Sequence, residues 1–169
     1  MADIVFITGG ARSGKSSFAM KMAKQVSSRP VYLATARVWD DDFKTRINRH
    51  KKERGEEWTN IEEEKSLDNL KLKGKTVVLD CVTLWITNIF HDNSYDFEKS
   101  LTQAKTIWNA FAENDFTLFV VSNEIGMGVH AVDEVSRKFT DLQGFINQFI
   151  ANMANDVYLM VSGIPVKIK

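Results

Sequence analysis

The chain has 169 residues, of which 44% are hydrophobic and 26% charged, and 2 prolines and 9 glycines exclude a disordered or collagen-like chain. Basic and acidic residues both total 22, so the basic excess that is typical of nucleic-acid-binding proteins is missing, and we expect no nucleic-acid partner. A single cysteine excludes an internal disulfide bond.

No internal repeat and no Pro/Ser-rich linker divides residues 1–169, so we expect a single domain over this range. The N-terminus carries no basic leader, and the strongest apolar runs, such as 117–121, are far too short to cross a bilayer. We therefore expect a cytoplasmic protein without a membrane segment.

Four short apolar runs predict β-strands. Each is rich in Val, Ile, Leu or Phe without clean alternation, which is typical of strands that are covered on both faces of a parallel sheet. The runs are Ile4–Thr8, Val31–Thr35, Thr76–Asp80 and Thr117–Ser122. Near the C-terminus, the runs 156–162 and 164–169 meet at Ser162-Gly163 and predict an antiparallel hairpin.

Helical patterns lie between the strands, because apolar residues there recur at steps of three and four. We expect each stripe to pack in the core. The members are Phe18, Met22 and Val26; then Phe97, Leu101, Ala104, Trp108 and Phe111; then Val132, Val135, Phe139, Leu142, Ile146, Phe149 and Met153. The alternation of strands and helices predicts an α/β sheet with helices on both faces.

The first predicted strand leads into a phosphate-binding loop. The loop matches G-x-x-x-x-G-K-[ST] between a strand and a helix, and it consists of Gly9, Gly10, Ala11, Arg12, Ser13, Gly14, Lys15 and Ser16. Lys15 should reach the β- and γ-phosphates, and Ser16 should hold Mg²⁺. Arg12 either touches phosphate or is solvated. The predicted fold class is therefore α/β and P-loop NTPase-like (RecA-like): a mostly parallel sheet flanked by helices, with a C-terminal antiparallel hairpin.

A carboxylate for the metal ion is predicted at the end of the third strand. Asp80 would point into the ligand crevice at the carboxyl edge of a parallel sheet and could hold Mg²⁺ there. The alternative is that Asp80 caps the helix that follows. Glu124, after the fourth strand, is a second candidate carboxylate. These features predict that a nucleoside triphosphate is bound and cleaved, without defining the acceptor.

The segment from Arg37 to Arg54 is basic and contains a histidine. On a helix, Arg46, His50 and Arg54 would lie four residues apart on one face. Two permanent cations would keep the imidazole neutral and nucleophilic, and they could clamp phosphate oxygens. From the pattern alone two interpretations stay open: a histidine that attacks a phosphate, or a solvated basic helix with an incidental histidine.

Several stretches together resemble the bifunctional adenosylcobinamide kinase/adenosylcobinamide-phosphate guanylyltransferase family of cobalamin biosynthesis. They follow one another in family order over nearly the whole chain. The phosphate loop is generic, whereas the Arg-Ile-x-x-His block, the Asn-Glu-Ile-Gly-x-Gly loop and the Ser-Gly-Ile-Pro tail are much more specific. The stretches are 8–16, 32–36, 46–51 with Arg54 and Trp58, 80–88, 122–128 and 161–167.

The resemblance implies two reactions. Adenosylcobinamide would be phosphorylated with ATP or GTP, and GMP would then pass from GTP onto that phosphate with release of pyrophosphate. The resemblance implies that His50 carries GMP covalently between donor and acceptor. It also implies a homo-oligomer, in the family a trimer. The nucleotide contacts that it implies beyond the phosphate loop are Thr35, Ala36, Arg37, Lys51, Lys52, Glu53, Arg54, Glu62 and Asp80.

Two rival functions stay open. One is a P-loop kinase of another small metabolite without a covalent step, and the other is a non-catalytic nucleotide switch. The sequence does not define whether ATP or GTP serves the kinase step, nor which residues contact the corrinoid. Among the remaining residues, we expect His91 and His130 at the surface, Trp85 and Trp108 in the core, and Cys81 as an inert buried thiol.

Overall fold

The computed structural model describes residues 1–38 and 55–169. The four predicted parallel strands and the first hairpin strand are found with bounds that differ by at most one residue at each end, and the second hairpin strand ends at Lys167, two residues earlier than predicted. The elements in chain order are β1 (Asp3–Gly9), α1 (Lys15–Val26), β2 (Val31–Ala34), β3 (Thr59–Glu62), a short 3₁₀ helix η1 (Leu67–Asn69), β4 (Thr76–Asp80), α3 (Val82–Asp92), α4 (Phe97–Ala112), β5 (Thr117–Val121), α5 (Glu134–Met153), β6 (Asp156–Val161) and β7 (Ile164–Lys167).

The strands form one seven-stranded sheet in the order β3-β2-β4-β5-β1-β6-β7. All neighbouring pairs are parallel except β6 and β7, which form the antiparallel C-terminal hairpin. One strand, β5, lies between β1, which leads into the phosphate loop, and β4, which ends in Asp80. This arrangement confirms the predicted α/β fold class, a mostly parallel sheet with a C-terminal antiparallel hairpin, in which the phosphate loop follows the first strand.

The edge strand β3 was not predicted from the sequence. It reads Thr-Asn-Ile-Glu, and three of its four side chains are exposed. With one apolar residue, Ile61, it carries neither an apolar run nor a clear alternation. Its place in the sheet comes from backbone pairing with β2, in which Val31 lies opposite Thr59 and Ala34 opposite Glu62.

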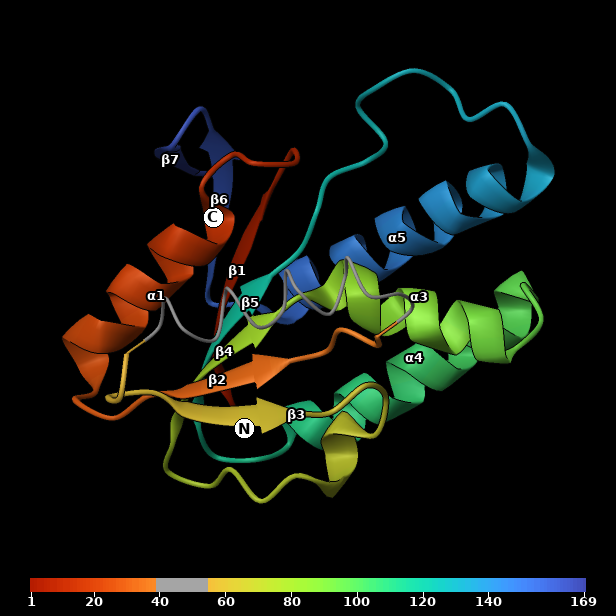
Figure 1. Cartoon of the computed structure of the whole chain (residues 1–169). Coiled ribbons are helices and arrows are strands. Elements are labelled where there is room, and N and C mark those ends of the chain that lie inside the picture. Colours follow the sequence, from red (N-terminus) through yellow and green to blue (C-terminus); the bar gives the residue numbers. More distant parts are fainter. Residues whose placement is uncertain (39–54) are drawn as a thin grey trace.

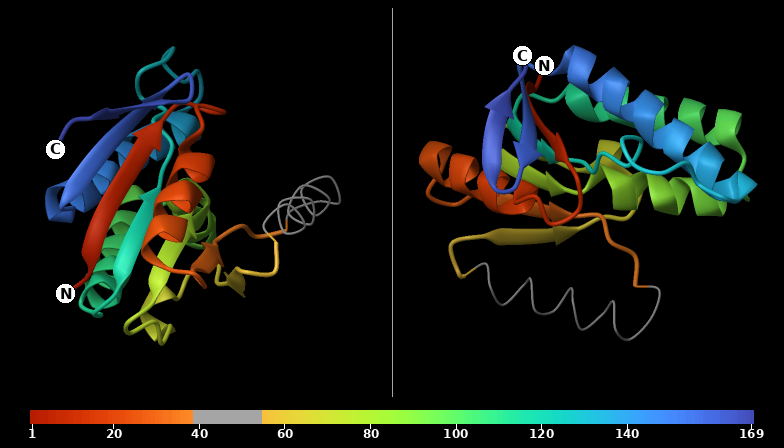
Figure 2. Two further views of the ribbon diagram at one scale, coloured as in Figure 1. Left: turned by 90° about the vertical axis from the view of Figure 1, so that its left-hand side faces the viewer. Right: turned by 90° about the horizontal axis from the view of Figure 1, so that it is seen from above.

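The sheet separates two layers of helices. Helix α1 covers one face, and α3, α4 and α5 cover the other (Figure 1, Figure 2). Successive residues of β1 pack into different cores: Ile4 and Phe6 belong to the cluster with α3, α4 and α5, whereas Val5 and Ile7 pack with α1. Burial on both faces explains why the strand sequences are continuously apolar. Trp85 and Trp108 are fully buried, as predicted.

Helix α5 begins later than its apolar stripe suggested. Asp133 caps the helix, since its Oδ1 accepts the N–H of Ser136 at 2.8 Å. Val132 therefore precedes the helix and is 94% exposed, and Val135 in the first turn is 43% exposed. The prediction that these two valines pack in the core is wrong, because the first turn of α5 projects past the sheet (Figure 1). Further along, Leu142 and Ile146 are buried as predicted.

The C-terminal hairpin turns at Ser162 and Gly163. Both residues have positive φ, 50° and 84°, as in the tight turns that match the twist of two-residue hairpins. The N–H of Gly163 donates to the carbonyl oxygen of Ser13 at 3.0 Å, so the turn is fixed to the phosphate loop. Both views place the hairpin beside the connection between β1 and α1 (Figure 1, Figure 2). In the described part of the chain, no helix has the length and apolar character needed to cross a membrane.

Candidate active site

The phosphate loop connects the carboxyl end of β1 to the N-terminus of α1. Gly9 and Gly14 have φ of 147° and 93°, values that favour glycine. Space also disfavours a side chain at both positions, more strongly at Gly9 than at Gly14. A Cβ at Gly9 would lie 2.6 Å from the carbonyl oxygen of Met160, and a Cβ at Gly14 would lie 3.2 Å from the Cα of Gly163. The two glycines therefore let the loop pack directly against β6 and the hairpin turn.

Lys15 is buried at the first residue of α1, with 7% of its surface exposed. Its ammonium group donates to the carbonyl oxygen of Gly10 and, at 3.4 Å, to Oγ of Ser13. Burial lowers the pKa of Lys15 below its ordinary value, and the nearby Cys81 and Asp80 oppose this effect. A buried ammonium at the start of a helix is suited to bind phosphate oxygens, because the backbone N–H groups of a helix N-terminus also favour an anion there.

Asp80 ends β4 at the carboxyl edge of the sheet and accepts a hydrogen bond from the hydroxyl of Tyr32. The residue that caps α3 is Cys81, so the alternative that Asp80 caps this helix is wrong. Tyr32 was not singled out from the sequence because it lies inside an apolar strand run. Its hydroxyl restricts the orientation of the carboxylate that faces the Lys15 side of the crevice.

The arrangement fits a magnesium ion. Mg²⁺ beside phosphates keeps waters and phosphate oxygens as most of its ligands, so one or two protein oxygens suffice. Ser16 in the first turn of α1 and Asp80 at the end of β4 are such oxygens. Within residues 1–38 and 55–169, no three His, Cys, Asp or Glu side chains gather to form an all-protein metal site.

The loop after β5 is fixed to the phosphate loop by its backbone. The N–H of Glu124 donates to the carbonyl oxygen of Gly9 at 3.0 Å, and Oε1 of Glu124 accepts the N–H of Gly126 at 2.7 Å. A buried polar network holds the same loop to the helices. Its bonds join Ser122 to Asn147 and Gln143, Asn147 to the carbonyl oxygen of Asn123, and the N–H of Asn123 to Thr83.

The carboxyl end of β2 holds Thr35, Ala36 and Arg37, which the resemblance placed in the nucleotide site. Thr35 is fully buried. Its hydroxyl donates a hydrogen bond to the carbonyl oxygen of Cys81 at 2.7 Å and accepts one from the backbone N–H of Cys81 at 3.0 Å. These bonds fix the end of β2 to the start of α3. Glu62 lies at the same edge, since it ends β3 opposite Ala34. The nucleotide contacts of these residues stay predictions.

Arg37 lies in an ion-pair network. Its guanidinium contacts Glu64 at 2.6 Å and Asp92 at 2.8 Å, and Lys65 also pairs with Asp92 at 2.5 Å. The hydrogen bonds that Arg37 donates to Asp92 and Glu64 raise the pKa of Arg37, and Arg37 holds the pKa of Asp92 well below its usual range. The network ties the chain after β2 to the C-terminal end of α3.

His50 lies outside the described residues, and so do Lys51, Lys52, Glu53 and Arg54. Their predicted roles stay predictions. The chain that contains them leaves the described structure after Val38, beyond the carboxyl end of β2, and returns at Gly55, before β3. The carboxyl end of β2 lies beside that of β4, because Ala34 is opposite Asp80 in the sheet. The last described residues before this segment therefore follow a strand that ends at the edge with the phosphate-site residues.

Cys81, His91 and His130 follow the sequence predictions. Cys81 is buried, and burial raises the pKa of its thiol to about 12, which agrees with an inert thiol. The side chain of His91 is 47% exposed beside Asp92, and His130 is exposed. Trp58, which precedes β3, is buried and packs edge-on against Tyr32 with ring centroids 6.0 Å apart.

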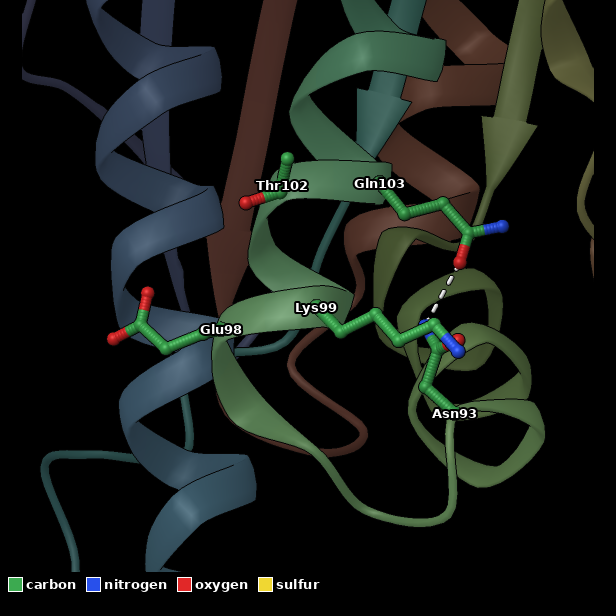
Figure 3. A pocket seen from close by; sticks show the side chains of 5 residues that line it. All are labelled: Asn93, Glu98, Lys99, Thr102 and Gln103. Atoms are coloured by element: carbon green, nitrogen blue, oxygen red, sulfur yellow. Dashed lines mark hydrogen bonds between the residues drawn. The ribbon is translucent and has the colours of Figure 1, made fainter.

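The structure contains two notable hollows. One, of about 300 Å³, touches the phosphate loop and is lined by Gly10, Ser13, Glu124, Met127, Leu159, Met160, Val161 and Ser162. The other, of about 600 Å³, lies at the junction of α3 and α4 and is lined by Asn93, Glu98, Lys99, Thr102 and Gln103 (Figure 3). Asn93 donates to Gln103 there at 2.8 Å. This junction is at the far end of α3 from Asp80 and brings no catalytic group together.

The comparisons with known proteins cover the whole chain. The sequence model of the family described as cobinamide kinase / cobinamide phosphate guanyltransferase matches residues 5–168. The bifunctional adenosylcobalamin biosynthesis protein CobU of Escherichia coli (strain K12) is 35% identical over 182 residues, with 98% of this chain and 99% of that protein covered. The corresponding protein CobP of Pseudomonas aeruginosa is 33% identical over 173 residues, with 100% of this chain and 98% of that protein covered.

Among solved structures, the flagellar accessory protein FlaH from Methanocaldococcus jannaschii is similar with a TM-score of 0.46 and 13% identity, over 99% of this chain and 78% of that one. Nothing about activity follows from a similarity of that degree. The family match and the full-length relatives confirm the resemblance that the sequence motifs suggested. The chain belongs to the cobinamide kinase / cobinamide phosphate guanyltransferase family.

Proposed function

We propose that this enzyme phosphorylates the aminopropanol hydroxyl of adenosylcobinamide with ATP or GTP and then transfers GMP from GTP to the new phosphate. The products of the second reaction are adenosylcobinamide-GDP and pyrophosphate. The single observation that carries the proposal is the complete phosphate loop, with the buried Lys15 beside Asp80, in a chain that matches the family from residue 5 to 168.

The kinase step needs positioning and charge stabilisation more than covalent chemistry. The backbone N–H groups of the phosphate loop and the ammonium of Lys15 would hold the β- and γ-phosphates. Mg²⁺, which Ser16 and Asp80 would hold, neutralises charge on these phosphates when it is bound. Tyr32 would keep Asp80 oriented for this task, since its hydroxyl donates to Oδ2 of the carboxylate.

The transfer step would use His50 as a nucleophile. A neutral imidazole nitrogen would attack the α-phosphorus of GTP, and the bond to the pyrophosphate oxygen would break. The phosphate of the acceptor would then attack the same phosphorus and free the histidine. The position of His50 in the Arg-Ile-x-x-His block supports this role, and so does its place in the chain soon after β2, which ends beside Asp80 at the carboxyl edge of the sheet. Arg37, Lys51, Lys52, Glu53, Arg54 and Glu62 are the proposed nucleotide contacts on this side.

Mass spectrometry of the protein after incubation with GTP and Mg²⁺ tests the covalent step. We expect one added GMP on the peptide that contains His50, released by acid and stable to base. A protein that phosphorylates cobinamide without ever gaining this mass would instead be a P-loop kinase that lacks the covalent step. A protein that hydrolyses nucleotide and accepts no cobinamide would contradict both reactions.

A further inference from the structure

The hollow beside the phosphate loop has two unlike parts. Most of its wall is apolar and comes from β6 and the loop after β5, through Leu159, Met160, Val161 and Met127. One carboxylate, Glu124, faces it, and its floor is the phosphate loop itself at Gly10 and Ser13. Sites for small organic molecules commonly combine apolar walls with a few placed polar groups.

Both walls are fixed to the phosphate loop by backbone hydrogen bonds. The hairpin turn is held by Gly163, whose N–H donates to Ser13, and the other wall by Glu124, whose N–H donates to Gly9, each at 3.0 Å. The turn also packs closely against the loop, since a Cβ added at Gly14 would lie 3.2 Å from the Cα of Gly163. The position of the hollow relative to a bound phosphate chain is therefore set by the fold.

The floor of the hollow is formed by residues that contact the ammonium group of Lys15. Gly10 and Ser13 line the hollow, and the same two residues accept hydrogen bonds from the ammonium of Lys15. In phosphate loops this lysine reaches the β- and γ-phosphates. A molecule in the hollow would thus lie next to the phosphate that a kinase transfers.

Glu124 has the geometry of a group that receives a proton. Its Oε1 is fixed by the N–H of Gly126 at 2.7 Å, and its second oxygen has no hydrogen-bond partner in residues 1–38 and 55–169. The backbone bond to Gly9 and the buried network from Ser122 to Asn147 hold the residue in place. A positioned carboxylate near a reacting hydroxyl contributes general-base catalysis.

We propose that this hollow binds the alcohol end of the phosphoryl acceptor and that Glu124 is a catalytic residue of the kinase step. The inference rests on the proposed function. The acceptor oxygen forms a bond to the γ-phosphorus while the bond from that phosphorus to the bridging oxygen breaks, and the bridging oxygen leaves with the nucleoside diphosphate. The hydroxyl proton passes to the carboxylate of Glu124 and then to water.

The size of the hollow defines which part of the acceptor it takes. A volume of about 300 Å³ is at the lower end for small-molecule sites, so it suits a short aliphatic arm that carries the hydroxyl. The rest of a large acceptor would remain outside, beyond the exposed Met127 and Val161. The apolar walls match an uncharged arm, and the carboxylate disfavours an acceptor that is already phosphorylated.

Separate assays of the two reactions test the role of Glu124. In Glu124→Gln the amide oxygen can still accept the N–H of Gly126, so the loop keeps its bond while the base is lost. We expect the kinase kcat with cobinamide to fall about 10²-fold. Formation of the GMP adduct from GTP, and transfer to cobinamide phosphate made beforehand, should change less than about twofold. Kinase activity within about threefold of wild type, or an equal loss of all activities, would overturn the assignment.

A second pair of variants tests the hollow without altering the carboxylate. Val161→Trp should fill it from the rim and raise the KM for cobinamide about tenfold, with the KM for nucleotide unchanged. Ile168→Trp is the matched control, because Ile168 is similarly exposed near the end of the hairpin but does not line the hollow. Equal KM values for cobinamide in both variants would overturn the acceptor site. A wild-type enzyme without cobinamide kinase activity would contradict the proposed function instead.

Discussion

The phosphate loop and the carboxyl end of β2 lie at the same edge of the sheet but are built differently. The loop is one continuous stretch, and backbone bonds to β6, the hairpin turn and the Glu124 loop fix its shape. Around Arg37, by contrast, charged side chains from separate elements meet, and their partners Glu64, Lys65 and Asp92 remain partly exposed. Phosphate binding is thus encoded locally and held rigidly, whereas the second region depends on ion pairs that solvent can screen.

The largest effect is expected from Lys15→Met, which removes the buried ammonium of the rigid region. Both kinase and guanylyl transfer should fall about 10²- to 10³-fold, because both need charge stabilisation at the phosphates. Lys21→Met, on the exposed side of α1, is the matched control and should keep both activities. Steady-state kinetics of the kinase and guanylyl-transfer reactions, measured for both variants, tests this prediction. A variant that is folded and keeps either activity would show that the loop does not serve both reactions.

The lowered pKa of Lys15 predicts that nucleotide binding depends on pH. Bound phosphates favour the charged amine, so binding should raise this pKa and take up protons at alkaline pH. Nucleotide affinity should therefore fall as pH rises through the lowered pKa, below the ordinary value of 10.5. Calorimetry between about pH 8 and about pH 10, in buffers of different ionisation enthalpy, measures this uptake. No net proton uptake in that range would argue against a buried ammonium as the phosphate ligand.

His50→Asn divides the two reactions. The covalent GMP adduct and net transfer should disappear, while the kinase keeps most of its rate because phosphoryl transfer needs no covalent residue. His91→Asn is the control, because His91 is partly exposed at the end of α3. Labelling with GTP that carries label at the α-phosphate gives the readout. Equal loss of both activities in folded His50→Asn protein would contradict the nucleophile assignment.

Gly14→Ala tests the rigidity of the loop. Its φ of 93° is strained for alanine, and the new Cβ would meet the Cα of Gly163 at 3.2 Å. We expect a loss of about 1–3 kcal/mol in the free energy of unfolding, together with weaker nucleotide binding. Gly128→Ala should cost little, since no atom lies within 4 Å of its added Cβ. Urea denaturation of both variants makes the comparison, and equal midpoints would show that the hairpin turn does not constrain the loop.

The smallest effect is expected from Asp92→Asn in the ion-pair region. The pairs are partly exposed, so the variant should lose at most about 1 kcal/mol of stability at neutral pH, and less at high salt. The pKa of Asp92 is lowered in the folded state, so its contribution is present above the ordinary carboxyl value of 3.8 and is lost as pH falls toward the lowered one. The Tm difference from wild type should therefore shrink below about pH 4. A difference that is independent of pH and salt would mean that packing, not charge, holds Arg37.

Features that depend on interactions between neighbouring residues were predicted correctly from the sequence. The strand β4 was predicted at its observed bounds, and the phosphate loop was read from eight consecutive residues. Features that depend on contacts between residues distant in the sequence were not predicted. The edge strand β3 has a polar sequence and is held by pairing with β2, and Val132 falls outside the core because Asp133 starts the helix. Tyr32 was missed as the partner of Asp80, since an apolar strand run hides a hydroxyl that acts at its end.

The sequence by itself determined the sheet class, the phosphate loop and the family, because glycine conformation, apolar runs and motif spacing are local properties of the chain. Only the tertiary structure decided what surrounds the loop. Gly163 and Glu124 are remote from Gly9 and Ser13 in the sequence, and the strand order β5-β1-β6 brings them to the two sides of the phosphate site. Backbone hydrogen bonds between such segments follow from the packing of the whole sheet, which no local pattern specifies.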